Sequence, residues 1–300
     1  MAIKRLEIYH DESYRKKWFI IGILWVDEAR KAQIVESLSD ERRRNNYWGN
    51  IHFCKLTNHS PKANTAREWF KIAKKSCQTG RLWFYLLAVN RHHEKYDRKR
   101  FSKDFHEYNR FTAIAIYSSF RWFFPNIKES KIVMYSDEKS RRPGGERYGD
   151  GISTDNFEEY IRFRFSHDIE EKLLKSENVI NYSITRLQHE IIDVVPLSTS
   201  GNRTSSEIKD EVELLELCDL LLGAFGKAIS GSIVSSKKSI KNELSDNAKR
   251  IIKDIEKEPW NQSFNLHRKI SVNAFPDENG KLYSKNVISS ADKNRTLYDF

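Results

Sequence analysis

The chain has 300 residues, of which 39% are apolar, enough to fill the core of one large domain or two small ones. Its 52 Lys and Arg residues exceed its 42 Asp and Glu residues, and the net charge of +10 favours a polyanionic partner. No apolar run approaches the roughly 20 residues of a membrane span, so no membrane association is expected. The N-terminus lacks a signal-peptide pattern, and the three cysteines lack paired spacing, which predicts reduced core thiols in a cytoplasmic protein.

The hydrophobic pattern alternates between strand-like and helix-like segments and predicts an α/β fold. Strands are predicted over 5–9 and 17–26, joined by a polar hairpin turn from Asp11 to Lys16. The second strand is apolar on both faces and should therefore be central. The pattern then predicts a helix over 27–44, a short strand over 51–56, a helix from Pro61, a strand over 81–89, a helix over 105–124 and a strand over 131–136.

A Gly- and Arg-rich segment over 140–151 follows and is predicted to be a mobile basic loop beside the acidic site. Its Arg141, Arg142 and Arg147 are candidate contacts to a nucleic-acid backbone. Further segments predict a helix over 155–176, strands over 181–188 and 190–196, and a helix over 207–230. Beyond Gly231 the composition is polar and lysine-rich, which predicts a solvated helix over 237–258 and a loosely packed tail past Pro259. The simplest division is a domain over 1–230 with a helical C-terminal extension over 231–300.

Four carboxylates that are far apart in sequence each stand at the edge of an apolar element: Asp11, Glu107, Asp137 and Asp219. Clustered carboxylates are the ligands that Mg²⁺ or Mn²⁺ prefers, and such a cluster on a basic protein indicates phosphodiester hydrolysis. If the first and fourth predicted strands are parallel neighbours, Asp11 and Asp137 emerge at the same end of the sheet. Open α/β sheets place their sites there.

Other interpretations of these residues remain open. Asp219 lies on the flank of an apolar helical stripe, where either a metal ion or an ion pair to Lys or Arg would offset its burial. Glu107 points inward with its apolar neighbours, yet an acidic residue is also favoured near a helix start. The segments 42–48 and 91–100 mix cations with aromatic residues, which suits either phosphate contact and base stacking or a solvated face.

Several segments together resemble the family catalogued as domain of unknown function 3800, in order and spacing, over residues 1–230. They are Tyr9-His10-Asp11-Glu12-Ser13, the run over 51–56, Tyr135-Ser136-Asp137-Glu138-Lys139 and the run over 216–224. Members of that family look like ribonuclease H-fold proteins, which implies a mixed β-sheet flanked by helices. They are often found in bacterial and phage genomes, some near defence genes. The chain departs from the family at Tyr14, where glycine is usual, and at Glu216 and Cys218, where glutamine and alanine are usual.

The resemblance implies that Asp11, Glu107, Asp137 and Asp219 hold two Mg²⁺ ions about 4 Å apart, with Asp11 bridging them. Glu12 and Glu216 are further candidate ligands. His52 and Lys55 are candidates for proton transfer or phosphate contact.

The leading hypothesis is therefore a metal-dependent nuclease that hydrolyses RNA or DNA. The rival is a catalytically inactive module on the same fold that binds nucleic acid or an unidentified partner protein. A strand-transfer or phosphotransferase enzyme is a third hypothesis, since the same metal geometry serves that reaction. The hypotheses differ in metal dependence: the binding module should bind nucleic acid equally well in EDTA.

Overall fold

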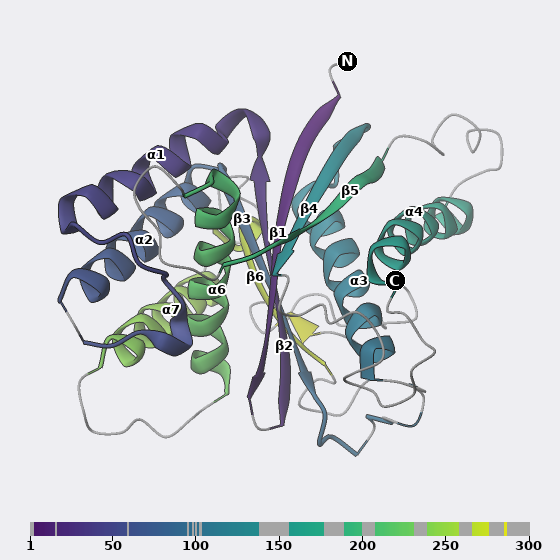
Figure 1. Cartoon of the computed structure of the whole chain (residues 1–300). Coiled ribbons are helices and arrows are strands. Elements are labelled where there is room, and N and C mark those ends of the chain that lie inside the picture. Colours follow the sequence, from purple (N-terminus) through teal and green to yellow (C-terminus); the bar gives the residue numbers. More distant parts are fainter. Residues whose placement is uncertain are drawn as a thin grey trace.

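The computed structural model is an α/β structure in which one mixed β-sheet lies between two layers of helices (Figure 1). It describes residues 3–15, 17–58, 60–94, 96–97, 99, 101, 104–137, 156–176, 189–199, 208–230, 239–257, 266–275 and 285–286. The strands are β1 (Lys4–Arg15), β2 (Trp18–Asp27), β3 (Leu82–Asn90), β4 (Ser130–Asp137), β5 (His189–Leu197), β6 (Ile270–Phe275) and β7 (Lys285–Asn286). The α-helices are α1 (Glu28–Asn45), α2 (Ser60–Gln78), α3 (Asp104–Phe123), α4 (Phe157–Ser176), α6 (Asp210–Ile229) and α7 (Ile240–Lys257), and two 3-10 turns are η1 (Phe53–Lys55) and η5 (Leu266–Arg268).

The seven strands of the sheet lie in the order β5-β4-β1-β2-β3-β6-β7. Neighbours β1, β2 and β3 are antiparallel, whereas β4 runs parallel to β1 and β5 runs parallel to β4. Parallel neighbours need crossover connections, and here these contain helices. The parallel pairing of β1 with β4 confirms the condition under which Asp11 and Asp137 share one end of the sheet.

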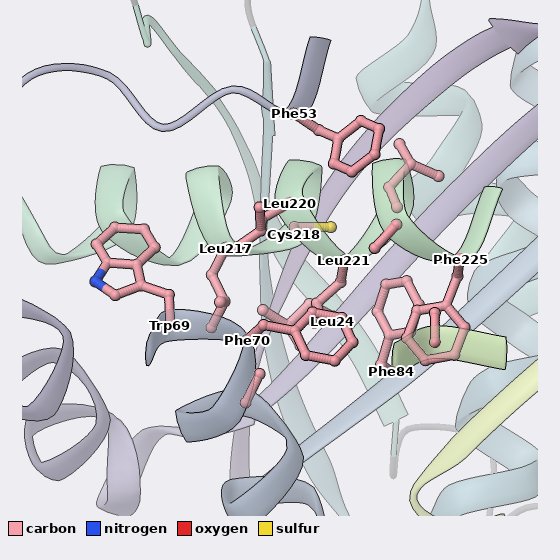
Figure 2. Close-up of a cluster of buried hydrophobic side chains, with 14 of the residues drawn as sticks. Leu24, Phe53, Trp69, Phe70, Phe84, Leu217, Cys218, Leu220, Leu221 and Phe225 are labelled. Atoms are coloured by element: carbon pink, nitrogen blue, oxygen red, sulfur yellow. The ribbon is translucent and has the colours of Figure 1, made fainter. Parts of the chain in front are cut away.

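The two central strands are buried on both faces. Every residue from Phe19 to Val26 in β2 and from Leu82 to Val89 in β3 is buried, which confirms the prediction of a central second strand. Helices α1, α2, α6 and α7 cover one face of the sheet, and α3 and α4 cover the other (Figure 1). Figure 2 shows the first of these two cores, where aromatic and aliphatic side chains from α2, α6, β2, β3 and η1 pack together.

Two local predictions are wrong. The segment from Asp11 to Arg15 is not a turn but the second half of β1, because its backbone continues the ladder from Asp11 opposite Gly22 to Arg15 opposite Trp18. The segment over 51–56 is not a strand. Its amides at Ile51 and Phe53 donate to carboxylates of α6 instead of to a neighbouring strand, and a single 3-10 turn forms at η1.

The C-terminal region contributes to the same sheet and core. Helix α7 is helical as predicted, but one face of it is buried against α6 and α2 through Ile240, Leu244 and Ile251. Strand β6 pairs with β3, so the prediction of loose packing past Pro259 is wrong for this strand. Of the three cysteines, Cys77 and Cys218 are buried, and Cys54 is exposed. Within the described ranges, no helix combines the length and the apolar character that a membrane crossing requires.

Candidate active site at the carboxyl end of β4

Two of the predicted acidic residues lie side by side on neighbouring parallel strands. The register pairs Tyr9 with Tyr135 and His10 with Ser136, so Asp11 and Asp137 follow at the same level. The rings of Tyr9 and Tyr135 stack with centroids 5.2 Å apart, which shows that these alternate positions point to one face. That face is the one covered by α6, since Tyr9 belongs to the α6 core.

Helix α6 brings the third carboxylate to this face. Helix α6 packs on β1 and β2, and the buried thiol of Cys218 lies 3.2 Å from the carbonyl oxygen of Tyr9. The next residue, Asp219, keeps a side chain that is 20% exposed. Its Oδ2 accepts the backbone N–H of Phe53 at 2.8 Å and lies 3.3 Å from Nδ1 of His52. Asp219 is thus half-buried, as its flank position predicts, and is held by η1 and the residue before it.

The carboxylates repel one another strongly. Burial raises the pKa of Asp11 well above its ordinary range, and the charges of Asp219, Glu12 and Asp137 raise it further. The hydrogen bond from the Glu12 backbone N–H to Asp11 Oδ1, 2.9 Å long, opposes this shift. The fold therefore concentrates negative charge at the carboxyl end of β4 and beside the middle of β1. Asp11, Glu12, Asp137 and Asp219 are the predicted residues that it brings together.

The turn that holds Asp219 depends on a glycine of α6. A Cβ at Gly223 would lie 2.1 Å from Phe53 Cγ, so only glycine lets the Phe53 ring pack against the helix at this point. The ring also lies beside a cation, since Arg15 Cζ is 5.4 Å from the Phe53 centroid. Arg15 also donates to the Gly223 carbonyl oxygen at 3.2 Å. Close packing of α6, Phe53 and Arg15 fixes the backbone N–H that reaches Asp219.

A buried ion triad holds the chain that leads into this turn. Arg42 is fully buried; its Nε donates to Glu213 at 2.8 Å and its Nη2 donates to Glu216 at 2.7 Å. It also donates to the carbonyl oxygens of Tyr47 and Gly49, and Glu216 accepts the Ile51 N–H at 3.3 Å. The segment 47–51, and with it His52, is therefore tied to α6.

Sequence patterns did not reveal the roles of Arg42 and Arg15. Arg42 belongs to a run of three arginines that predicts a solvated or phosphate-binding face, yet only Arg43 and Arg44 are exposed on that run. The buried glutamates on α6, one turn apart at positions 213 and 216, are the signal that a buried cation is required. The sequence indicates the role of Arg15 more weakly. Arg15 is the last residue of β1 and lies on the same side of that strand as Asp11.

Glu107 stands apart from the cluster. It lies on α3, which covers the opposite face of the sheet (Figure 1). Its side chain is buried. Its carboxylate pairs with Arg91, with Nε to Oε1 and Nη2 to Oε2 distances of 3.1 Å each. The charges that act most strongly on Asp11 are those of Asp219, Glu12 and Asp137.

The remaining candidates occupy different positions. Glu216 is engaged by Arg42 and Ile51, and Lys55 is exposed on η1. His52 adjoins Asp219, and its Nε2 is buried with no hydrogen-bond partner among the described residues. Arg141, Arg142 and Arg147 lie outside the residues that the structure describes.

Asp11, Asp137 and Asp219 are the residues that could hold a divalent cation, because oxygen ligands of this kind suit Mg²⁺ and Mn²⁺. A divalent cation would offset the repulsion that these carboxylates exert on Asp11. In the described part of the chain, however, no three His, Cys, Asp or Glu side chains are arranged to hold a metal ion as they stand. Binding would require the carboxylates to draw closer together.

No protein family matches this chain in a scan of family models, and no curated protein matches it in a sequence search.

Proposed function

We propose that the chain is a Mg²⁺- or Mn²⁺-dependent nuclease with a ribonuclease H-like fold that hydrolyses phosphodiester bonds of RNA or DNA. One observation carries the proposal: Asp11, Asp137 and Asp219 come from two parallel strands and a helix, and burial together with the charges of Asp219 and Asp137 raises the pKa of Asp11. A strongly basic protein that gathers its carboxylates at one point is suited to bind a divalent cation beside a phosphate chain.

The positions of the carboxylates in the fold support the proposal. They come from the first strand, the fourth strand and a late helix, which are the elements that carry ligands in the family that the sequence resembles. The mixed sheet flanked by helices agrees with the same family at the level of architecture. Glu107 would have to leave Arg91 to join such a site, so Asp11, Asp137 and Asp219 form the core of the proposed ligand set.

Bound Mg²⁺ or Mn²⁺ would stabilise the charge that builds on the phosphate and on its leaving oxygen. The protein's own contribution to proton transfer lies at His52. An ionised carboxylate only accepts hydrogen bonds, so the contact between Asp219 Oδ2 and His52 Nδ1 assigns the proton to Nδ1. The lone pair then lies on Nε2, which has no partner among the described residues. His52 is therefore oriented to accept a proton at Nε2 from an attacking water.

The test compares Asp137→Asn and Asp219→Asn with Asp254→Asn, a matched change at an exposed aspartate of α7. The amide keeps the side-chain volume and loses the charge, so both site variants should lose more than about 100-fold in Mn²⁺-dependent cleavage, and Mn²⁺ affinity should fall in calorimetry. Nucleic-acid binding in EDTA should stay near that of the unsubstituted protein. Asp254→Asn should behave like the unsubstituted protein in all three assays. Undiminished cleavage by either site variant would assign the chemistry elsewhere.

The second candidate is a non-catalytic module that binds nucleic acid. The observation that favours it is that no three potential ligands in the described residues are arranged for a metal ion. The same assays separate the two candidates. A module of this kind would bind nucleic acid in EDTA, cleave none of the RNA, DNA or hybrid substrates, and show no Mn²⁺ binding that depends on Asp219.

A further inference from the structure

We propose that five cations around η1 form a binding surface for the phosphate backbone of a nucleic acid and lead that backbone to Asp219. This η1 basic surface consists of Arg15, Lys55, Lys62, Lys227 and Lys241. The proposal deepens the proposed function, on which its choice of partner rests.

The cations converge because η1 binds them through its backbone and its ring. Lys62 of α2 donates to the Lys55 carbonyl oxygen at 3.0 Å, and Lys241 of α7 donates to the Cys54 carbonyl oxygen at 2.6 Å. Arg15 of β1 lies over the Phe53 ring. Residues from three elements far apart in sequence thus surround one turn, the turn whose Phe53 N–H also holds Asp219.

Lys227 extends the surface along α6. It lies one helical turn beyond Gly223, whose carbonyl oxygen binds Arg15. Partial burial lowers the pKa of Lys227, and the charges of Arg15, Lys241 and Lys249 lower it further. The pKa of Lys62 is likewise lowered, first by burial, and Lys55 and Lys241 add to the shift. These cations are therefore near enough to repel one another, a repulsion that a polyanion would relieve.

The nearby carboxylates do not neutralise the surface. None of the five cations forms an ion pair with a carboxylate of the described residues, whereas Glu243 pairs with Arg67 and Asp246 pairs with Lys249. Glu216, which is close enough to act on Lys62, is engaged by Arg42. The carboxylate that acts on Arg15 is Asp219 itself, so the surface adjoins the proposed catalytic site.

Two helices begin at this surface and add to its positive potential. Helix α2 starts at Ser60 and helix α7 starts at Ile240, whose backbone N–H donates to Asn58 Oδ1 at 2.9 Å. The positive end of each helix dipole therefore lies beside η1, where it favours an anion such as a phosphate group.

The other basic segments that are described are less available. Arg42 is buried in its ion triad, and Arg43 and Arg44 pair with Asp40 and Glu41 on the same helix. Arg91 pairs with Glu107. A phosphate that bound there would first have to displace a carboxylate, whereas the η1 basic surface presents cations without such partners.

The test removes three charges from the surface and compares the result with the same loss elsewhere. The triple variant Lys62→Gln, Lys227→Gln and Lys241→Gln keeps polar side chains that can still donate hydrogen bonds. The matched control is Lys75→Gln, Lys131→Gln and Lys253→Gln, three exposed lysines on α2, β4 and α7. Both proteins are checked for unchanged circular dichroism and then titrated in EDTA, over a range of salt, with short fluorescein-labelled RNA and DNA single strands and duplexes.

The surface variant should bind every sequence more weakly, by at least about tenfold at low salt. The slope of log affinity against log salt should fall by about two units on a single strand, since each phosphate contact contributes about 0.7, and by nearly three on a DNA duplex, at about 0.9 each. The control should lose less than one unit. Equal losses in the two variants, no loss in either, or absence of binding by the unsubstituted protein would overturn the proposal.

Measurement in EDTA separates this proposal from the proposed nuclease activity. A protein that binds through the η1 basic surface but cleaves nothing would contradict only the nuclease proposal. A protein that cleaves in an Asp219-dependent way but whose salt slope is unaffected by the three glutamines would contradict only the surface.

Discussion

Helix α6 carries two buried glutamates and, one turn further on, an aspartate, and the surroundings of the glutamates differ from those of the aspartate. Glu213 and Glu216 are buried against Arg42, which donates a hydrogen bond to each of them at 2.7–2.8 Å. Asp219, one turn further on, instead faces Asp11, another carboxylate. Its own bonding partners are a backbone N–H and a histidine.

The comparison shows that acids on one helix can either be neutralised by a buried cation or lie close to other carboxylates. The triad combines one cation with two anions and uses nearly every polar atom of Arg42, so it stabilises the position of the segment 47–51. The aspartates instead bring like charges close together, which does not stabilise the folded state. The raised pKa of Asp11 beside the other carboxylates is the feature on which the proposed metal site rests.

The largest effect is expected when the triad loses its cation. Arg42→Met leaves two buried carboxylates uncompensated and should lower the free energy of unfolding by about 3–5 kcal/mol, measured by urea denaturation. Arg43→Met, the same change at the exposed neighbour, should cost less than about 0.5 kcal/mol. Combining Arg42→Met with Glu213→Leu and Glu216→Leu should restore most of the stability. A single Arg42→Met variant as stable as the unsubstituted protein would remove the contrast between the two groups.

A smaller effect is expected where α6 meets η1. Gly223→Ala places a Cβ against Phe53, and such overpacking costs about 1–3 kcal/mol, offset in part by the roughly 1 kcal/mol that alanine gains over glycine in a helix. Because Phe53 must move, Asp219 should lose its N–H partner, and cleavage should fall more than stability does. Gly226→Ala is the control, since its Cβ would meet the flexible end of Ile20 at 3.1 Å and Arg15 Nε at an ordinary contact distance of 3.5 Å. Identical behaviour of the two alanine variants in thermal unfolding and cleavage would argue against a positioning role for Phe53.

The smallest effect, and one of opposite sign, is expected at Asp11. Because its pKa is raised in the folded protein, the folded state binds a proton more tightly than the unfolded chain, and stability falls as pH rises from about 4 through the raised pKa. Asp11→Asn removes that loss. In EDTA the variant should melt at a higher temperature than the unsubstituted protein at neutral pH, and the difference should close near about pH 4.

Metal ions should reverse the order of the melting temperatures of Asp11→Asn and the unsubstituted protein. Mg²⁺ or Mn²⁺ should raise the melting temperature of the unsubstituted protein at neutral pH more than that of Asp11→Asn, because a ligand that binds the folded state stabilises it by mass action. Asp254→Asn, an exposed aspartate, should show neither effect. A variant at Asp11 that is less stable than the unsubstituted protein in EDTA at neutral pH would mean that the carboxylates do not repel one another as described.

The fold could be predicted from sequence wherever apolar periodicity is strong. The run from Phe19 to Val26 and the stripe of α6 are apolar enough to determine their own structure. Prediction failed where a distant partner decides the conformation. The polar residues from Asp11 to Arg15 become a strand only because β2 pairs with them, and β6 becomes a strand only beside β3.

The candidate site likewise has residues that a local pattern identifies and residues whose state depends on a distant partner. Asp11, Asp137 and Asp219 could be identified because each follows or flanks an apolar element, and the parallel pairing of β1 with β4 then places two of them at one level. Glu216 and Glu107 could not be classified from sequence. Whether a buried carboxylate meets a cation depends on long-range neighbours, here Arg42 and Arg91, which no local pattern specifies.

The sequence by itself determined the α/β class, the central strands, the basic charge and the three aspartates that converge, because these depend on periodicity and composition. Only the tertiary structure decided which acids are neutralised, and that η1 rather than a strand presents Phe53, His52 and a group of lysines beside Asp219. The physical reason is that charge balance and backbone hydrogen bonding are determined by groups brought together in space. Among the described residues of this chain such groups are separated by up to 209 positions in sequence.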